Sequence, residues 1–253
     1  MSLAGQCYYS LCNTTGGHVL ARSFVRSIRK LGLARKAFTP FDALELKPQA
    51  LRGLIQLWKR IHWSPGDGMM PVEQLLAIYD HVLRWPGDGD VVELGSWTGL
   101  TTCYLATACQ QRGASHVYAV DTFEGTMEYG QTYPSVAGFG GSTYAEFTKR
   151  IEQAGHKDRV TPLVGRTDHW AGQYPGKPIR VLFIDADHSF EGVRDDFENW
   201  HRHVEPGGLI IFHDHNFPGV KRFIEETLRD DPRIRPKPGL VAENVYMATR
   251  TAE

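Results

Sequence analysis

The chain has 253 residues, of which 42% are hydrophobic and 23% are charged, which is enough apolar material for a sizeable core. Its 28 basic and 29 acidic residues nearly cancel, so the composition gives no sign of a nucleic-acid partner. No apolar stretch approaches the roughly 18 residues of a membrane span and no signal-peptide core is present, so we expect no membrane partner and a soluble, cytoplasmic protein.

The N-terminal 62 residues differ in pattern from the rest of the chain. Residues 21–36 contain six basic residues and no acidic one, with apolar residues at helical spacing. A helix that packs on the main domain or on a second subunit is favoured here over a helix on a membrane surface. A second helix is predicted over Pro48–Ile61. We therefore expect residues 1–62 to form a helical extension, for oligomerisation or for covering the substrate, on a domain of residues 63–253. The expected assembly is a homo-oligomer (a dimer or larger).

From residue 64 onward the chain alternates short apolar strands with amphipathic helices. After a turn-rich break at 64–71, a helical stripe begins at Val72 and stops before Pro86. Strands are predicted at Val91–Leu94, His116–Val120, Val160–Val164, Val181–Asp185 and Leu209–His213. Helices are predicted at Gly99–Gln111, Tyr144–Ala154, Phe190–His203 and Gly219–Arg229. Two last β segments, 233–241 and 244–249, have no helix between them and predict an antiparallel edge. The whole predicts an α/β, Rossmann-like fold with a mostly parallel sheet and helices on both faces.

The four cysteines show no C-x-x-C spacing, and two of them, Cys103 and Cys109, lie in one predicted helix. This pattern indicates free thiols in a reducing compartment rather than a disulfide framework or a zinc site.

A glycine loop follows the first strand of the predicted sheet. Its spacing is E-x-G-x-x-x-G, from Glu93 through Gly95 to Gly99, and glycine there lets the backbone approach a ligand closely. Trp97 stands near the position where a dinucleotide-binding loop needs its middle glycine, which argues against NAD or FAD. The second strand ends at Asp121, where a carboxylate can accept hydrogen bonds from the ribose of an adenosine. The ordinary alternative is a simple strand-to-helix turn.

The stretches "VVELGSWTG" and "VYAVDTFEG" resemble the first two motifs of class I S-adenosylmethionine-dependent methyltransferases, over about residues 71–249. The resemblance implies a sheet that ends in an antiparallel hairpin and S-adenosyl-L-methionine as cofactor. It places the glycine loop at the methionine part, Asp121 at the ribose, and Thr167 or Asp168 near the adenine. The full set of residues expected to bind the cofactor is Glu93, Gly95, Ser96, Thr98, Gly99, Asp121, Thr122, Thr167, Asp168 and Asp185.

A second acidic cluster follows the fourth and fifth predicted strands. Asp185 ends one strand and Asp214 follows the other, so both carboxylates should open into one crevice. Two close carboxylates repel, which either raises one pKa or calls for a cation between them. Oxygen ligands suit Mg²⁺, with Mn²⁺ or Ca²⁺ as alternatives, and imidazole ligands would favour a transition metal. The structural alternative is that Asp187 or Asp214 caps a helix and that the histidines nearby are merely solvated.

"DTFEG" and "DADHSFEGV" resemble the metal-dependent macrocin and mycinamicin sugar O-methyltransferases and the related cephalosporin-hydroxylase-like proteins. The resemblance implies Asp185 and Asp214 as metal ligands, His213 or His215 as a third ligand, and His188 as general base. The chain departs from that group in having histidines on both sides of Asp214, which leaves the third ligand and the identity of the metal open.

The predicted activity is therefore metal-assisted O-methylation of a hydroxyl on a small molecule, such as a sugar, polyketide or phenolic natural product. His188 and Asp185 are the predicted catalytic residues. Residues 126–143 are rich in glycine and aromatic residues and form either a substrate lid or a flexible insertion. The alternatives left open are a hydroxylase-like relative that binds the cofactor without transferring methyl, an NAD-dependent oxidoreductase, and a non-enzymatic scaffold.

Overall fold

The computed structural model describes residues 48–61, 70–128, 131–133, 136–237 and 244–252. The basic helix predicted within residues 21–36, and Cys7 and Cys12, lie outside this part of the chain. The main sheet contains β1 (Asp90–Leu94), β2 (Val117–Asp121), β5 (Val160–Val164), β6 (Ile179–Ile184), β7 (Val204–His213), β8 (Ile234–Pro236) and β9 (Val245–Arg250). The helices are α4 (Pro48–Ile61), α5 (Val72–Arg84), α6 (Leu100–Arg112), α7 (Tyr144–Ala154), α8 (Thr167–Ala171), α9 (Phe190–Trp200) and α10 (Pro218–Phe223).

The sheet has the strand order β5-β2-β1-β6-β7-β9-β8. All neighbours from β5 to β7 pair in parallel, whereas β9 runs antiparallel to both β7 and β8. The predicted Rossmann-like fold with its antiparallel C-terminal hairpin is thereby confirmed. Because the chain crosses from β1 outward to β2 and β5 and then returns to β6, the strand order reverses between β1 and β6. Ligands of open α/β sheets bind at this point, beyond the carboxyl ends of the strands.

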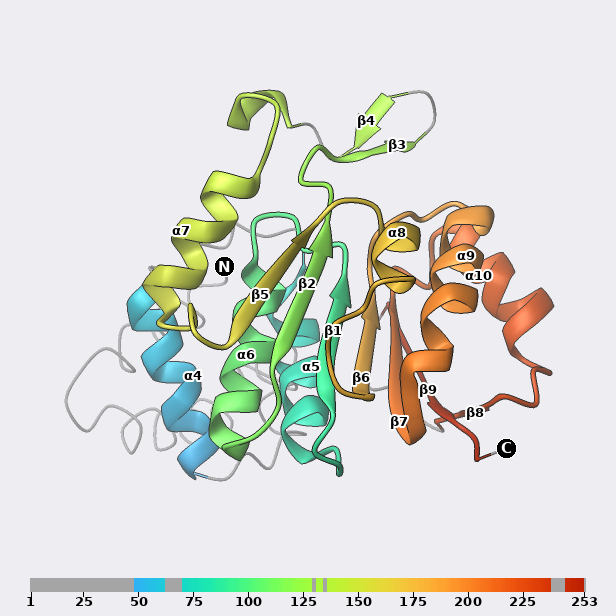
Figure 1. Cartoon of the computed structure of the whole chain (residues 1–253), viewed down its shortest axis with the longest axis horizontal. Coiled ribbons are helices and arrows are strands. Elements are labelled where there is room, and N and C mark those ends of the chain that lie inside the picture. Colours follow the sequence, from blue (N-terminus) through green and yellow to red (C-terminus); the bar gives the residue numbers. More distant parts are fainter. Residues whose placement is uncertain (1–47, 62–69, 129–130, 134–135, 238–243, 253) are drawn as a thin grey trace, which may run out of the picture.

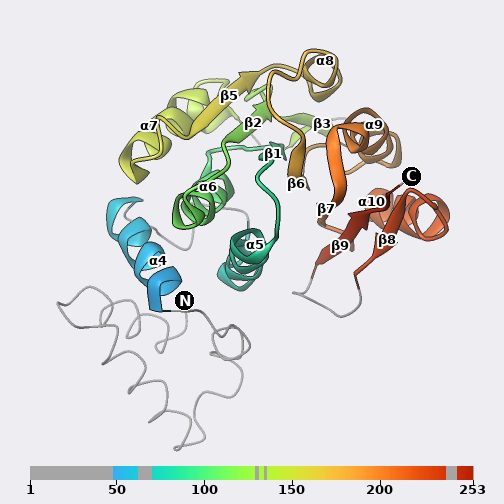
Figure 2. The same ribbon diagram turned by 60° about the horizontal axis from the view of Figure 1, so that its bottom comes forward.

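Helices cover both faces of the sheet, as the apolar pattern of the strands requires (Figures 1 and 2). Side chains alternate along β6, so Val181 and Phe183 belong to the core under α4, α5, α6 and α7. Leu182 and Ile184 belong to the second core, together with residues of α9 and α10. Every residue of β1 and β6 is buried, which is typical of central parallel strands.

Helix α4 packs directly on this domain. Leu54, Leu57 and Trp58 are buried in the same core as residues of α5 and α6, and Trp58 Nε1 donates a hydrogen bond to the Tyr104 hydroxyl at 2.6 Å. The described end of the predicted extension is thus part of the main core. The division of the chain at residue 62 stays a prediction for the residues before Pro48.

The structure refines several predicted boundaries. β7 begins at Val204 rather than Leu209, because it first pairs with Ile179 and then shifts register before the continuous pairing. The last predicted helix is divided into α10 and a π-helical segment, Ile224–Leu228. α8 was not predicted, because five residues are too few to show helical periodicity.

Residues 126–143, predicted as one loop, contain a short hairpin of β3 (Thr126–Glu128) and β4 (Gln131–Tyr133), followed by a 3₁₀ turn, η1 (Ala137–Phe139). Both elements stand beyond the carboxyl ends of the central strands (Figure 1).

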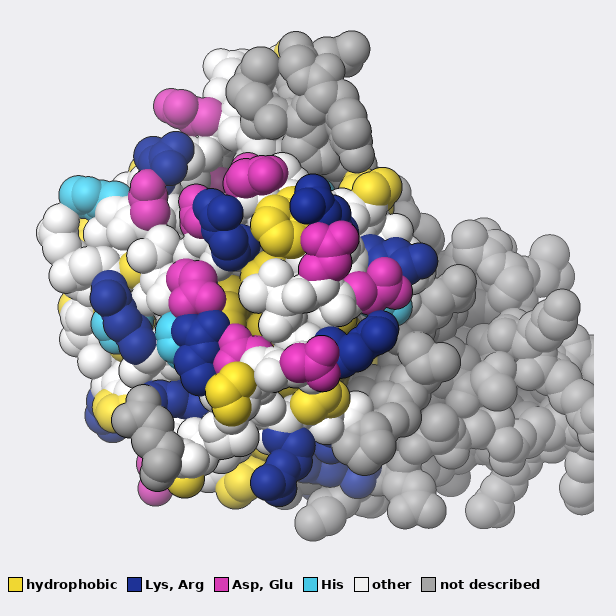
Figure 3. All heavy atoms as spheres, turned by 90° about the vertical axis from the view of Figure 1, so that its right-hand side faces the viewer, with side chains coloured by type: hydrophobic (Ala, Val, Ile, Leu, Met, Phe, Trp, Pro, Cys, Tyr) yellow, Lys and Arg dark blue, Asp and Glu magenta, His cyan; other side chains and the backbone are white. Residues whose placement is uncertain are grey.

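Basic and acidic side chains are interspersed on the face formed by the α9 and α10 end of the molecule (Figure 3). Pairs in these elements include Arg233 Nη2 with Glu198 Oε1 at 2.7 Å and Arg222 Nε with Glu226 Oε2 at 2.9 Å. Exposed pairs of this kind contribute about 0–1 kcal/mol each, so the apolar cores dominate stability. Within the described part of the chain, no helix combines the length and the apolar content that crossing a bilayer requires.

The shared core makes a prediction about α4. Leu54→Ala should lower the free energy of unfolding by about 2–5 kcal/mol, because it leaves a cavity where a fully buried side chain packed. The measurement is urea denaturation followed by circular dichroism, with the exposed Gln56→Ala on the same helix as control. An unchanged main transition in Leu54→Ala would show that α4 is not part of the core.

Candidate active site

A cavity of about 510 Å³ opens beyond the carboxyl ends of the central strands. It is lined by the turns that follow β1, β2, β5, β6 and β7, so segments far apart in the sequence meet at one place. Among the residues predicted to bind a cofactor, those that line it are Gly95, Ser96, Thr98, Asp121, Thr122, Thr167, Asp168 and Asp185. Glu93 at the end of β1 and Gly99 at the start of α6 do not line it.

The loop after β1 passes against the end of β6. A Cβ atom on Gly95 would stand 2.1 Å from the carbonyl oxygen of Asp185, and Gly95 has a φ of +83°. Both facts exclude a side chain at this position, since the left-handed region favours glycine and the contact leaves no room. The loop backbone is therefore held at the cavity wall with no side chain of residue 95 covering it.

Asp121 at the end of β2 holds the same loop. Its Oδ2 accepts hydrogen bonds from the backbone N–H groups of Ser96 at 2.7 Å and Trp97 at 2.8 Å, and its Oδ1 accepts one from Phe123 at 2.6 Å. Burial raises the pKa of this carboxyl, although the three N–H donors oppose that shift. The sequence predicted Asp121 only as a ribose ligand. The structure adds that it fixes the shape of the glycine loop.

Glu93 is fully buried beneath the loop and accepts a hydrogen bond from the Thr102 hydroxyl. Burial raises the pKa of this carboxyl to about 8. Gly99 also serves packing, since a Cβ there would stand 2.8 Å from the Phe147 ring. Both residues support the cavity from behind, and a direct contact with the cofactor stays a prediction.

The far end of the cavity lies between α8 and α9. Thr167 and Asp168 line it, and Asp168 pairs with Arg166 at 2.7 Å, which holds the pKa of the Asp168 carboxyl below its usual range. Asp196 also lines it, although sequence reasoning missed this residue. Asp196 is only 4% exposed, burial raises its pKa to about 7, and its Oδ2 has no hydrogen-bond partner among the described residues. Its position three residues after the buried Val193 on α9 was the available signal, since that face should be apolar.

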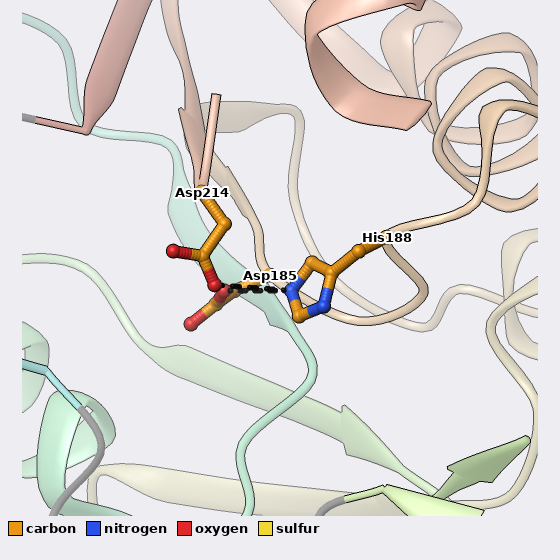
Figure 4. Close-up of side chains that lie close together, drawn as sticks. All are labelled: Asp185, His188 and Asp214. Atoms are coloured by element: carbon orange, nitrogen blue, oxygen red, sulfur yellow. Dashed lines mark ion pairs between the residues drawn. The ribbon is translucent and has the colours of Figure 1, made fainter. Parts of the chain in front are cut away.

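Three side chains from the ends of β6 and β7 converge in the same cavity (Figure 4). Ligand atoms of Asp185, His188 and Asp214 all lie within 4.8 Å of one another. His188 Nε2 stands 3.6 Å from Asp185 Oδ1 and 3.4 Å from Asp214 Oδ2. The two carboxylates lie close together because β6 and β7 are parallel neighbours and each acid follows the end of its strand. Asp187 has a local function, since its Oδ1 accepts the backbone N–H of Ser189 at 2.8 Å.

The two other predicted metal ligands lie differently. His213 Nδ1 donates to Asp185 Oδ1 at 2.9 Å, and its Nε2 faces Gln74 Oε1 at 2.8 Å, so both ring nitrogens already have protein partners. His215 does not line the cavity. Among the described residues, the three side chains whose ligand atoms could together hold one ion are therefore Asp185, Asp214 and His188, and the set does not include His213 or His215.

The histidines set the charge of Asp185. Burial by itself would raise the pKa of the Asp185 carboxyl, but His213 and His188 outweigh burial and hold that pKa below its usual range. Burial by itself would lower the pKa of His213, but Asp185 and Asp214 outweigh burial and raise that pKa to about 10. The pair is thus a carboxylate next to an imidazolium. A further residue that the sequence did not indicate is Asn244, whose Nδ2 donates to Asp214 Oδ1 from the edge of β9.

Comparison with known proteins identifies the class. Residues 92–215 match a family described as a methyltransferase domain. The O-methyltransferase NovP has a similar structure, with a TM-score of 0.65 at 17% identity over 81% of this chain and 100% of that one. The O-methyltransferase TomG from Streptomyces achromogenes, involved in tomaymycin synthesis and solved with S-adenosylmethionine, gives a TM-score of 0.54 at 16% identity, covering 84% and 94%. The matched domain and these relatives together support a class I S-adenosylmethionine-dependent methyltransferase, as the two motifs predicted.

A curated relative is the 8-demethyl-8-(2,3-dimethoxy-alpha-L-rhamnosyl)-tetracenomycin-C 4'-O-methyltransferase of Streptomyces olivaceus, 26% identical over 163 residues. The match covers 58% of this chain and 61% of the relative. An uncharacterized Sinorhizobium fredii protein is 28% identical over 127 residues, which cover 49% of this chain and 13% of that protein. The chain therefore spans less than two thirds of the length of either relative.

The buried Glu93 predicts a specific pH dependence of stability. Its folded pKa of about 8 lies above the ordinary value of 4.5, so the folded state keeps a proton that the unfolded state has released between these two values. Stability should therefore fall by up to about 1.4 kcal/mol per pH unit as the pH rises through this window. Glu93→Gln removes the titration and should flatten that part of the profile.

The measurement is urea denaturation at several pH values from about 5.5 to about 8. Glu124→Gln, which changes an exposed carboxylate, is the matched control and should follow the wild type. Parallel profiles for wild type and Glu93→Gln would contradict the buried, protonated carboxyl.

Proposed function

We propose that the protein is an S-adenosylmethionine-dependent O-methyltransferase that uses a divalent cation to activate a hydroxyl of a small molecule. The observation that carries this proposal is that Asp185, His188 and Asp214 converge in the same cavity as the Gly95 loop. A donor held by the loop and an acceptor held by the cluster would be neighbours. Methyl transfer between two bound molecules depends chiefly on such positioning.

The residues present fit the cofactor. When bound, S-adenosylmethionine supplies a methyl group on a positively charged sulfonium. Gly95 leaves the loop backbone open to a ligand, because the left-handed φ and the Asp185 contact exclude a side chain. Asp121 Oδ1 accepts one backbone hydrogen bond, and a carboxylate oxygen has capacity for a second donor such as a ribose hydroxyl. Thr167 and Asp168 would then lie towards the adenine.

The residues also fit a divalent cation. Asp185 and Asp214 offer carboxylate oxygens on one side of the cavity, and oxygen ligands suit Mg²⁺, Mn²⁺ or Ca²⁺. The depressed pKa of Asp185 keeps that carboxylate charged and available. A cation there would lower the pKa of an acceptor hydroxyl, which by itself is a poor nucleophile at neutral pH.

In this proposal His188 receives the proton of the acceptor hydroxyl at Nε2. That nitrogen faces both carboxylates, which would stabilise the imidazolium formed. Phe217 packs against the ring, with centroids 5.0 Å apart, and limits its movement. A positioned imidazole is the usual general base at neutral pH.

The acceptor is proposed to be a hydroxyl of a natural product, and the site is proposed to resemble the metal-dependent sugar O-methyltransferase group. The tetracenomycin relative, named for a rhamnosyl 4'-O-methylation, supports a sugar hydroxyl. The β3–β4 hairpin and η1 stand beyond the carboxyl ends of the central strands (Figure 1), which supports the proposal that residues 126–143 cover the acceptor. We further propose a homo-oligomer joined through the N-terminal segment. A cytoplasmic location is also proposed, supported by the free thiols of Cys103 and Cys109.

Cofactor binding tests the loop. Wild-type protein should bind S-adenosylmethionine and S-adenosylhomocysteine in isothermal titration calorimetry. Gly95→Ala should weaken both by at least about tenfold, because the new Cβ displaces the loop from Asp185. Gly113→Ala is the matched control, since Gly113 has a φ of +77° but no atom within 4 Å of its Cβ position. A wild-type chain that binds neither compound would overturn the proposed function.

Turnover tests the cation and the base. We expect S-adenosylhomocysteine to form with members of a panel of sugars and catechols, and EDTA or Asp214→Asn to abolish it. His188→Ala should lower turnover by about 100-fold or more, with cofactor affinity within about twofold of wild type. His169→Ala, an exposed histidine outside the cavity lining, is the control. Full turnover in EDTA would refute the cation, whereas loss of cofactor binding in His188→Ala would refute its assignment as base.

A further inference from the structure

Gln74 connects the first turn of α5 to the candidate active site. It lies outside residues 92–215, the stretch matched by the methyltransferase domain, and it is 139 positions from its partner in the sequence. Its side chain is buried, with 6% of its surface exposed. Met70, just before α5, lines the cavity itself, so this end of the helix belongs to the cavity wall.

A hydrogen-bonded chain runs from this helix to the acidic cluster. Gln74 Oε1 lies 2.8 Å from His213 Nε2, and His213 Nδ1 lies 2.9 Å from Asp185 Oδ1. The imidazole is buried and has a partner at each nitrogen, so rotation or a flip of the ring would break both contacts. His213 in turn fixes which oxygen of Asp185 is engaged. The carboxylate that faces His188 and Asp214 (Figure 4) is thus oriented through His213 and Gln74.

The Gln74 contact is not required for attaching α5 to the domain. Leu75, Leu76, Ile78, Tyr79 and Val82 on this helix are all fully buried and belong to the core under the sheet. An apolar side chain at position 74 would serve that packing equally well. A buried amide instead has a desolvation cost that only its hydrogen bonds offset, which points to an orienting function.

We propose that Gln74 is a positioning residue that holds His213 in the orientation from which it fixes Asp185. The inference rests on the proposed function, because its consequence is the geometry of the carboxylate pair that would hold the cation. Residues that orient metal ligands typically change metal affinity by about 10–100-fold when they are removed. Helix α5, which precedes the matched domain, is accordingly part of the active site.

The test compares three full-length variants by titration with Mn²⁺. Gln74→Leu keeps the volume and removes the acceptor, whereas Gln74→Glu keeps an acceptor oxygen at the same place. We expect Gln74→Leu to bind Mn²⁺ about 10–100-fold more weakly and Gln74→Glu to stay within about threefold of wild type. Gln56→Leu, an exposed glutamine on α4, is the control. Thermal denaturation shows whether each variant is folded. The affinity for S-adenosylhomocysteine is expected to stay within about twofold of wild type for every variant.

Equal Mn²⁺ affinity in wild type and Gln74→Leu would overturn the inference. So would a Gln74→Glu variant as weak as Gln74→Leu, because the acceptor would then have no importance. A second readout does not involve metal: ¹⁵N-detected histidine spectra, with the His213 signals assigned through His213→Asn, should show its Nε2–H exchanging faster in Gln74→Leu. If the wild type binds no Mn²⁺, the divalent cation in the proposed function is refuted. The inference about Gln74 is tested separately, and an unchanged His213 signal in Gln74→Leu would overturn it.

Discussion

The contact between the loop after β1 and the end of β6 is the constraint on which the site depends. A side chain on Gly95 would collide with the backbone of Asp185, so the loop lies directly against the residue that begins the acidic cluster. The Asp121 carboxylate holds the same loop from the other side through the N–H groups of Ser96 and Trp97. These contacts fix the distance between the loop after β1 and the acidic cluster that begins at Asp185. Methyl transfer needs such a separation between donor and acceptor.

Buried acids around this contact have opposite protonation tendencies. Glu93 and Asp196 are buried with few compensating partners, and burial raises their pKa values to about 8 and about 7. Asp185 is also buried, yet the histidines beside it hold its pKa below the usual range. Charge is therefore retained at the Asp185 carboxylate of the acidic cluster and suppressed at the Glu93 carboxyl behind the loop. The difference arises from neighbours rather than from residue type.

Much of the fold followed from local pattern. The strands of the central sheet are apolar and short, the helices are amphipathic, and the last two segments have no room for a crossover helix, so the hairpin was predictable. Asp185 and Asp214 could be placed together because each comes at the end of one of two neighbouring strands. Asp196 and Asn244 were missed for different reasons. Asp196 stands at helical spacing on the buried face of α9, and this signal went unused. Asn244 is a single polar residue whose partner, Asp214, lies elsewhere in the chain, and no spacing rule indicates it.

The sequence by itself determined the class of protein, the cofactor loop with its acidic partner, and the edge of the sheet where the acids gather. These features depend on residues close together in the chain, where spacing translates into geometry. Only the tertiary structure decided how each histidine meets the carboxylates. His213 Nδ1 lies 2.9 Å from Asp185 and 3.4 Å from Asp214, with Gln74 at its Nε2. His188 Nε2 faces the same two acids, and His215 does not line the cavity. Side-chain direction at the end of a strand depends on what packs behind it, and here that is a helix 139 positions away.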